Sequence, residues 1–281
     1  MAIPILRTIA ELRRHVADWR GKGETVGLVP TMGALHEGHL SLVRRSRAAC
    51  TRTVVSIFVN PTQFGPNEDF NRYPRDLAGD AAKLATVGAD AIFAPEVAEM
   101  YPAGASTTVT VGGLTDGLDG PFRPGHFAGV ATIVTKLLLQ TLPDTAFFGE
   151  KDYQQLQVIK RLVRDLDVPV RIEGVPTYRE PDGLAMSSRN VYLSAAERAT
   201  APVLYRVLTN VAKALAGGET AAAAIMRGKS ELAEAGFSKI DYLEAVDAAT
   251  LQPVERVTGP ARVAGAAWLG ATRLIDNVAV G

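Results

Sequence analysis

A turn between a predicted strand and a predicted helix constrains this chain more than any other feature. Residues 25–29 have the apolar pattern of a β-strand, and Leu40 begins an amphipathic pattern at helical spacing. Gly33 and Gly38 lie between them and permit tight turns and the close approach of a ligand. We therefore expect a helix after His39 whose N-terminus presents backbone N–H groups, an arrangement that suits phosphate.

Two histidines in this turn suggest chemistry on the phosphate. His36 and His39 are half of the chain's 4 histidines. Imidazoles change charge near pH 7 and can donate hydrogen bonds to a phosphate that is being transferred. An ordinary loop remains the alternative for such a turn. The segment His36-Glu37-Gly38-His39 resembles the HxGH signature of the superfamily that contains nucleotidyltransferases and class I aminoacyl-tRNA synthetases.

Composition limits the class of protein. With 281 residues, 47% of them hydrophobic, the chain can bury a substantial core. Lysine plus arginine and aspartate plus glutamate number 30 each, so we expect no overall attraction to nucleic acid or to an anionic membrane. No long apolar run or signal-peptide pattern occurs, and the single cysteine, Cys50, excludes an internal disulfide framework. We expect a cytoplasmic protein in which Cys50 is a small core residue.

The order of the predicted elements indicates an α/β fold with a Rossmann-like parallel sheet, because strands and helices alternate along the chain. Two segments between them are candidate functional loops. Residues 62–74 are long and rich in proline and charge, and residues 112–129 are rich in glycine and contain Arg123 and His126. The predicted helices are 8–20, 76–87, 130–141 and 153–166, in addition to the one after His39, and the predicted strands are 25–29, 53–59, 89–94, 107–111, 145–148 and 168–175.

The rest of the chain has a different character. The turn signal at Pro181-Asp182-Gly183 favours a domain boundary nearby, so we expect a catalytic nucleotide-binding domain at 1–177 and a smaller α+β domain at 178–281. The smaller domain contains predicted helices at 195–214 and 219–235 and β-like segments at 241–246 and 262–269.

Polar turns at 32–39, 149–155 and 186–189 recur around the predicted sheet. The carboxyl ends of parallel strands face one crevice, so the first two turns should meet there. Lys151 supplies a positive charge for phosphate, while Ser187, Ser188 and Arg189 offer hydroxyls and a forked cation. Each turn alone is also typical of a solvated loop. Their joint occurrence favours a nucleotide site.

Five segments together resemble the pantothenate synthetase family over almost the whole chain. They are residues 30–39, 58–64, 73–75, 148–155 and 186–190. The resemblance implies ATP-dependent condensation of pantoate with β-alanine through a pantoyl-adenylate, in the pathway to coenzyme A. It also implies a homodimer formed through the first domain.

The resemblance assigns roles to individual residues. His39 matches the catalytic proton donor, with His36 beside it and Lys151 as a further catalytic residue. Gln63 and Gln155 match the pair that holds pantoate, since each amide offers a donor and an acceptor, and Asn60 assists them. Tyr178 departs from the small aliphatic residue whose backbone contacts adenine. The segments that match ATP-binding positions are Met32, Gly33, Ala34, Leu35, His36, Glu37, Gly38 and His39, then Gly149, Glu150, Lys151 and Asp152, Tyr178, and finally Met186, Ser187, Ser188 and Arg189.

Magnesium should accompany ATP and bridge its phosphate oxygens. Asp80 matches an acidic position near that ion, although a solvated carboxylate on the predicted helix is the alternative. Two other functions stay open from the residues alone. One is another enzyme of the superfamily, such as a phosphopantetheine adenylyltransferase or a cytidylyltransferase, and the other is a nucleotide-binding protein without turnover.

Overall fold

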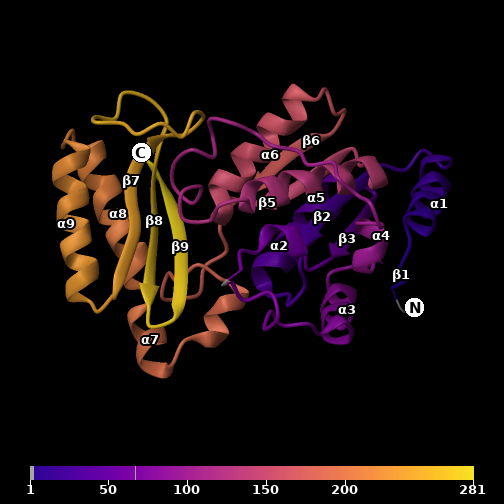
Figure 1. The fold of residues 1–281 in the computed structure, drawn as a ribbon, viewed down its shortest axis with the longest axis horizontal. Coiled ribbons are helices and arrows are strands. Elements are labelled where there is room, and N and C mark those ends of the chain that lie inside the picture. Colours follow the sequence, from indigo (N-terminus) through magenta and orange to yellow (C-terminus); the bar gives the residue numbers. More distant parts are fainter. Residues whose placement is uncertain (1–2, 67) are drawn as a thin grey trace. The chain divides into compact units, whose positions relative to one another are not determined.

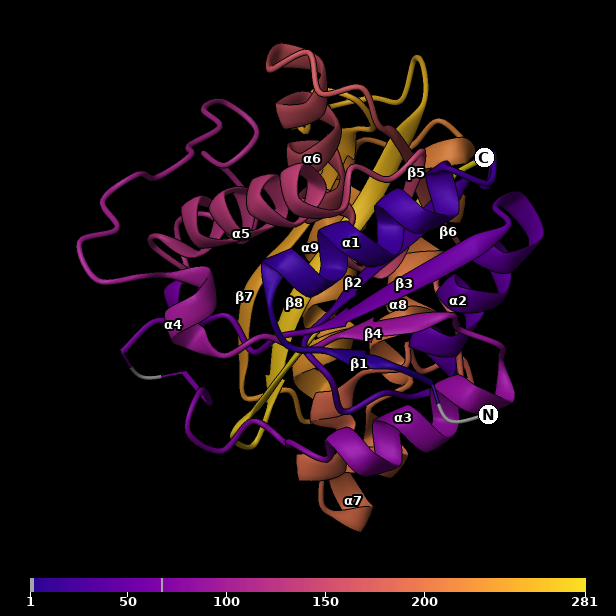
Figure 2. The same cartoon turned by 90° about the vertical axis from the view of Figure 1, so that its right-hand side faces the viewer.

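The computed structural model describes residues 3–66 and 68–281 and divides the chain into two compact units, shown as ribbons in Figure 1 and Figure 2. The first unit comprises Met1–Val111, Arg123–Glu150 and Val158–Pro176. The second comprises Gly112–Phe122, Lys151–Gln157 and Thr177–Gly281. Two segments that lie inside the predicted first domain, 112–122 and 151–157, thus belong to the second unit.

The described part of the first unit forms one parallel sheet with the strand order β1-β4-β3-β2-β5-β6, which confirms the predicted α/β fold. From β2 the chain moves to β3 on one side, and from β5 it moves to β6 on the other side. The boundary between β2 and β5 is therefore the switch point of the sheet, where α/β proteins place ligands. The strands are β1 (Ile5–Leu6), β2 (Val26–Thr31), β3 (Arg52–Ile57), β4 (Ala91–Phe93), β5 (Thr145–Gly149) and β6 (Arg171–Val175).

Helices cover both faces of this sheet. In Figure 2, α1 and α5 lie on one side of the strands, and α2 and α3 lie on the other. Both faces of the central strands are therefore buried, which explains the continuous apolar runs in β2 and β3. The helices are α1 (Ile9–Arg20), α2 (Glu37–Ala49), α3 (Leu77–Thr86), α4 (Val97–Met100), α5 (His126–Thr141) and α6 (Tyr153–Asp165).

A close approach of α2 to the sheet depends on one glycine. A Cβ atom at Gly27 in β2 would lie 2.1 Å from the Oγ atom of Ser46 in α2. Cys50, at the end of α2, is buried as predicted, and burial raises the pKa of its thiol. The helix that carries the histidine turn is thus fixed tightly against β2.

Two predicted elements of the first unit are wrong in detail. Residues 107–111 form no strand, because the N–H group of Val109 donates to Thr132 Oγ1 of α5, at 2.9 Å, in place of a neighbouring strand. Helix α5 begins at His126, four positions before the predicted start at 130. Its first turn lies in the segment that glycine content marked as a loop.

The second unit packs two helices on one face of an antiparallel sheet, as Figure 1 shows for α8, α9 and β7–β9. This confirms the predicted α+β unit. The predicted helix 195–214 is divided at Ala201-Pro202 because proline cannot continue the helix, and β9 was not predicted. The elements are α7 (Ala195–Thr200), α8 (Val203–Ala216), α9 (Ala221–Glu234), β7 (Lys239–Asp247), β8 (Ala261–Leu269) and β9 (Thr272–Val280).

Short 3-10 turns occur at η1 (Pro61–Gln63), η2 (Glu150–Asp152) and η3 (Ser188–Tyr192), which lie in or begin within the motif segments 58–64, 148–155 and 186–190. Within residues 3–66 and 68–281, none of the helices combines the length and the apolar character needed to cross a membrane.

Candidate active site

The two histidines of the central turn lie at the start of α2. The helix begins at Glu37, three positions earlier than predicted, because His36 acts as its N-cap residue. The Nδ1 atom of His36 accepts a hydrogen bond from the N–H group of Gly38 at 3.2 Å. The Nδ1 atom of His39 accepts one from the N–H group of His36 at 3.4 Å. The pair thus forms a reciprocal capping box built from imidazoles.

This capping decides which nitrogen of each imidazole is protonated. A nitrogen that accepts a hydrogen bond carries no proton, so each neutral ring is assigned its proton on Nε2. The ring centroids of His36 and His39 are 4.1 Å apart. Two Nε2–H donors from adjacent rings suit an anionic group such as a phosphate.

The backbone of the turn differs from the expectation. We expected its N–H groups to face a phosphate, and for Ala34 and Leu35 this is wrong. The N–H group of Ala34 donates to Asp80 Oδ2 at 2.9 Å, and that of Leu35 donates to Asp80 Oδ1 at 2.8 Å. Gly33 and Ala34 both have positive φ angles, 84° and 50°, which turn consecutive amides towards Asp80. The donors that this turn offers to a ligand are therefore mainly its side chains.

Asp80, the residue that matches the magnesium position, is a buried side chain of α3. It is 1% exposed, so the alternative of a solvated carboxylate is wrong. Burial raises the pKa of Asp80, and this effect is opposed by the amides of Leu35 and Ala34 and by Lys83. Both carboxylate oxygens already bond backbone amides, so the geometry does not fit the predicted metal ligand. Among the described residues, no group of three or more His, Cys, Asp or Glu is placed to hold a metal ion.

Three predicted residues of the first unit come together beside β3. The side-chain amide of Gln63 donates through Nε2 to the Sδ atom of Met32 at 3.2 Å. Its Oε1 atom accepts a hydrogen bond from Asn60 Nδ2 at 3.1 Å. Asn60 itself is 1% exposed, and its Oδ1 atom accepts from Tyr101 at 2.8 Å. Asn60 therefore orients Gln63 from inside the protein.

The backbone of Gln63 is held by residues to which the sequence assigned no role. The carbonyl oxygen of Gln63 lies 2.8 Å from Nδ1 of His126, whose Nε2 lies 2.9 Å from Nη1 of Arg123. Since arginine can only donate, Nε2 accepts and Nδ1–H donates to the carbonyl. Arg123 also makes a bidentate ion pair with Glu68, at 2.8 and 2.7 Å. The signal in the sequence was the pair Arg123 and His126, three positions apart in the glycine-rich segment.

Lys151 lies in η2, directly after β5, where Gly149 and Glu150 connect the strand to the turn. Its Nζ atom is 3.6 Å from Asp152 Oδ1. Its carbonyl oxygen accepts a hydrogen bond from Nδ2 of Asn277, in β9, at 2.9 Å. The last strand of the second unit thus fixes the backbone of the predicted phosphate-binding lysine.

The residues that follow Lys151 are also held within the second unit. The hydroxyl of Tyr153 donates to the carbonyl of Ala248 at 2.9 Å, and the guanidinium of Arg262 lies 3.9 Å from the Tyr153 ring centroid. Gln154 is buried, and its Nε2 donates to the carbonyl of Leu114 at 2.9 Å. Its neighbour Gln155, the predicted pantoate ligand, is therefore carried on a segment with a fixed backbone.

The third predicted segment forms a compact turn in the second unit. The N–H group of Met186 donates to the carbonyl of Tyr178 at 3.0 Å, which brings two predicted ATP-binding segments together. Ser187 caps η3 by accepting from the N–H group of Arg189 at 3.2 Å, and Ser188 lies between them. The Tyr178 side chain is 41% exposed, so its ring is accessible although its carbonyl is engaged.

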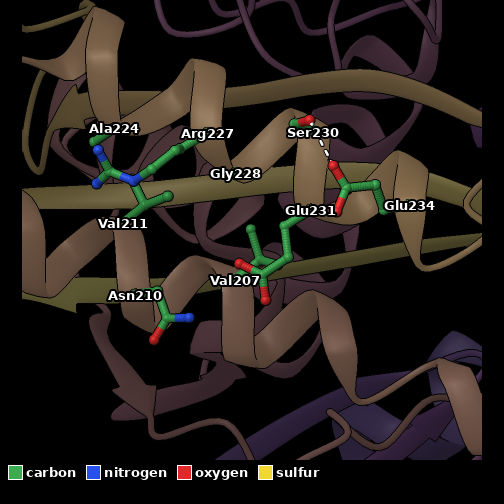
Figure 3. A pocket seen from close by; sticks show the side chains of 9 residues that line it. All are labelled: Val207, Asn210, Val211, Ala224, Arg227, Gly228, Ser230, Glu231 and Glu234. Carbon is green, nitrogen blue, oxygen red and sulfur yellow. Dashed lines mark hydrogen bonds between the residues drawn. The ribbon is translucent and has the colours of Figure 1, made fainter.

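A pocket of about 310 Å³ opens between α8 and α9 (Figure 3). Its lining includes the apolar residues Val207, Val211 and Ala224 and charged residues such as Arg227 and Glu231. Figure 3 also shows the hydrogen bond from Ser230 to Glu234, at 3.0 Å. None of the residues that the sequence singled out lines this pocket, so it is separate from the predicted chemistry.

Comparisons with known proteins cover the whole chain. The family described as pantoate-beta-alanine ligase matches residues 4–279. A pantothenate synthetase of Paramagnetospirillum magneticum is 61% identical over 279 residues, which are 99% of this chain and 98% of the relative. One of Rhodospirillum rubrum is 57% identical over 280 residues, 99% of each chain.

Solved structures that resemble this chain belong to the same family as these relatives. A crystal structure of pantothenate synthetase from Thermus thermophilus matches with a TM-score of 0.93 at 50% identity and covers 98% of this chain and 99% of its own. A pantoate-beta-alanine ligase from Francisella tularensis, complexed with beta-gamma ATP and beta-alanine, matches with a TM-score of 0.83 at 34% identity, covering 99% and 97%.

Proposed function

Since the chain belongs to the pantoate-beta-alanine ligase family, we propose that it joins the carboxyl group of pantoate to the amine of β-alanine and consumes ATP. The observation that carries this proposal is the family match over residues 4–279, which includes all five motif segments. Other superfamily enzymes, such as phosphopantetheine adenylyltransferase, share the histidine turn but need neither the glutamine pair nor the second unit. The comparisons support the ligase and not these alternatives.

The chemistry proceeds in two steps. A carboxylate is a poor acyl donor, so a carboxylate oxygen of pantoate attacks the α-phosphorus of ATP, and the bond to pyrophosphate breaks. The amine of β-alanine then attacks the acyl carbon of the pantoyl-adenylate, a C–N bond forms, and AMP leaves. The amine loses its proton to solvent. Pantothenate, AMP and pyrophosphate are the products.

We assign the residues to these steps from the local geometry of each unit. His36 and His39 donate through Nε2–H to phosphate oxygens as negative charge builds up, and Lys151 adds a positive charge. His39 is the catalytic proton donor. Gln63 and Gln155 hold pantoate, and Asn60 keeps the Gln63 amide in one orientation. Tyr178 and the segment at 186–189 bind the rest of ATP through backbone and side-chain groups.

We propose that Mg²⁺ accompanies ATP and is held mainly by phosphate oxygens and water. Such an ion needs few protein carboxylates. We propose that the reaction takes place in the cytoplasm, where ATP is available. No nucleic acid or membrane is required.

We also propose a homodimer formed through the first unit. Leu139, Leu142 and Leu166 of this unit are about half exposed, at 49%, 50% and 53%, and a partner subunit would cover such apolar side chains. Sedimentation velocity at micromolar concentration should give the mass of two chains. A single species with the mass of one chain would contradict the dimer.

The function is tested by product analysis. With ATP, pantoate and β-alanine, the purified protein should form AMP and pantothenate in equal amounts. With ATP and phosphopantetheine, but without pantoate and β-alanine, no pyrophosphate should appear. Pyrophosphate from phosphopantetheine would instead identify an adenylyltransferase, and ATP binding without any product would identify a nucleotide-binding protein.

A further inference from the structure

The turn that carries the histidines has an unfavourable backbone. Gly33 and Ala34 follow each other with φ angles of 84° and 50°. Alanine rarely adopts a positive φ, and such a residue persists only where surrounding contacts enforce it. Leu35, the next residue, directly precedes His36, so any movement of this backbone moves the first imidazole. The turn therefore needs an anchor outside itself.

Helix α3 provides that anchor. Asp80 accepts hydrogen bonds from the amides of Ala34 and Leu35 through its two carboxylate oxygens, at 2.9 and 2.8 Å. Lys83, one turn further along α3, donates through Nζ to the carbonyl of Leu35 at 2.7 Å and lies 3.8 Å from Asp80 Oδ1. Leu35 is thus held at its N–H and at its C=O by two side chains of one helix.

The carboxylate also explains the residue at position 33. A Cβ atom at Gly33 would lie 3.0 Å from Asp80 Oδ2 and 3.1 Å from Cγ2 of Ile57. A side chain at position 33 would therefore push the turn away from Asp80, in addition to its strained φ. Gly33 and Asp80, which are 47 positions apart in the sequence, together determine the conformation of the turn.

We propose that Asp80 is a positioning residue of this enzyme, which fixes the backbone N–H groups of Ala34 and Leu35 before His36 and thereby aims the His36 and His39 rings at the α-phosphate of ATP. The proposal rests on the proposed function for its catalytic consequence. It replaces the expected role in metal binding, because the carboxylate is 1% exposed and both of its oxygens already accept backbone N–H groups. Lys83 supports the next peptide, between Leu35 and His36, through the carbonyl of Leu35.

Asp80→Asn is the variant that tests this. The amide keeps one acceptor oxygen but turns an NH₂ group towards a backbone N–H, so one of the two anchoring bonds is lost. The matched control is Asp76→Asn, which removes the same charge from the same helix. Asp76 caps α3 by accepting from the N–H group of Gly79, at 2.9 Å, and asparagine caps equally well.

The expected result is a split between kinetic parameters. In Asp80→Asn, kcat should fall by about 10²-fold, the loss that a misplacement of about 1 Å causes. The KM for pantoate should change by less than about twofold, because Gln63 is held by other residues. Asp76→Asn should retain both values. Raising the Mg²⁺ concentration should not restore Asp80→Asn, whereas restoration would identify a metal ligand and overturn the proposal.

A second readout does not depend on activity. Long-range ¹H–¹⁵N NMR spectra distinguish imidazoles protonated on Nε2 from those protonated on Nδ1. Wild-type protein should show the Nε2–H tautomer for His36 and His39, and Asp80→Asn should show exchange between tautomers at His36. Unchanged histidine signals in the folded variant would overturn the proposal. This readout holds even if the wild-type protein catalyses a reaction other than the proposed one. If Asp80→Asn does not fold, Lys83→Met removes the bond to the Leu35 carbonyl and the longer contact with Asp80 Oδ1, while both bonds from Asp80 to the turn remain, and it should give a smaller change of the same kind.

Discussion

His36 has two tasks that a substitution can separate. Its Nδ1 atom caps α2, and its Nε2–H is assigned to the phosphates of ATP. Alanine removes both functions, whereas asparagine is a good N-cap residue that lacks the distant donor. The same side chain therefore contributes to stability and to turnover through different atoms.

We predict that His36→Ala and His36→Asn both lose about 10²-fold to 10³-fold in kcat, the usual effect of removing one donor to a developing charge. Only His36→Ala should also lose about 1 kcal/mol in the free energy of unfolding. Steady-state kinetics and urea unfolding measure the two effects. Wild-type turnover in His36→Asn would show that the ring does not contact the phosphates. His39→Ala and Lys151→Ala should lose turnover with the fold intact.

The sequence predicted the position of the histidines because both lie within one short motif. The motif at 32–39 marked the turn, and the structure places both histidines within it. Asp80 could not be assigned in the same way, because its partners lie 45 and 46 positions earlier, and periodicity contains no information about such contacts. The same reason applies to His126, whose partner carbonyl belongs to Gln63, 63 positions away.

At the scale of elements, the sequence pattern predicted the helices whose N-cap residues are evident in the sequence. It failed for elements that depend on contacts with distant residues. Helix α1 begins after Thr8, which forms a capping box with Glu11, close to the predicted start. Helix α5 begins inside a glycine-rich segment, after Gly125 in a left-handed conformation. Strand β9 was missed because Arg273, Asp276 and Asn277 interrupt its apolar pattern, and their burial depends on partners elsewhere in the second unit.

Strand β9 acts on the binding segment through Asn277. We predict that Asn277→Ala, which frees the carbonyl of Lys151, lowers kcat/KM for ATP by about tenfold, since the lysine backbone is no longer fixed. Ala279→Ser, an exposed change on the same strand, is the control and should leave kinetics unchanged. Initial rates at several ATP concentrations give the values. Equal kinetics in Asn277→Ala and wild type would refute the role of this bond.

The sheet of the second unit contains a partly buried carboxylate, Asp241, whose two ion pairs give it a predictable response to acid. Burial raises the pKa of Asp241, but hydrogen bonds from Lys239, Arg273 and Trp268 outweigh burial and hold the pKa below its ordinary value of 3.8. The Arg273 Nε atom is 2.7 Å from Asp241 Oδ2, and the Lys239 Nζ atom is 2.8 Å from Oδ1. A depressed carboxyl pKa contributes stability that is present above 3.8 and is lost as the pH falls through the folded-state pKa.

We therefore predict that Asp241→Asn lowers the free energy of unfolding at pH 7, and that its difference from wild type shrinks as the pH falls below 3.8. Urea unfolding followed by circular dichroism, at several pH values, measures this difference. A difference that stays constant down to acidic pH would mean that the ion pairs of Asp241 add nothing to stability.

At the scale of the whole molecule, the order of chemistry is the sharpest expectation. The proposed pantoate ligands are amide side chains that do not depend on the amine, so adenylate formation should run without β-alanine. We predict exchange of labelled pyrophosphate into ATP that requires pantoate but not β-alanine. Holding the adenylate away from water should prevent AMP from accumulating until the amine is added.

Other outcomes of the exchange experiment have clear meanings. Exchange that strictly needs β-alanine would indicate a concerted reaction of three substrates. Release of ADP would indicate an acyl phosphate formed by transfer of the γ-phosphate. Omitting pantoate is the control that excludes exchange catalysed by a contaminating enzyme.

The bond between Asn277 and Lys151 has a consequence for how the protein is made. The two residues are 126 positions apart, so at ribosomal speeds Lys151 is synthesised roughly 6 to 25 s before its partner exists. During that interval the first strands of the parallel sheet are already available to fold, but the lysine segment still lacks the strand that fixes it. A nascent chain that ends before β9 therefore lacks the bond that holds the Lys151 carbonyl, and this part of the proposed site is completed only when the last strand has been made.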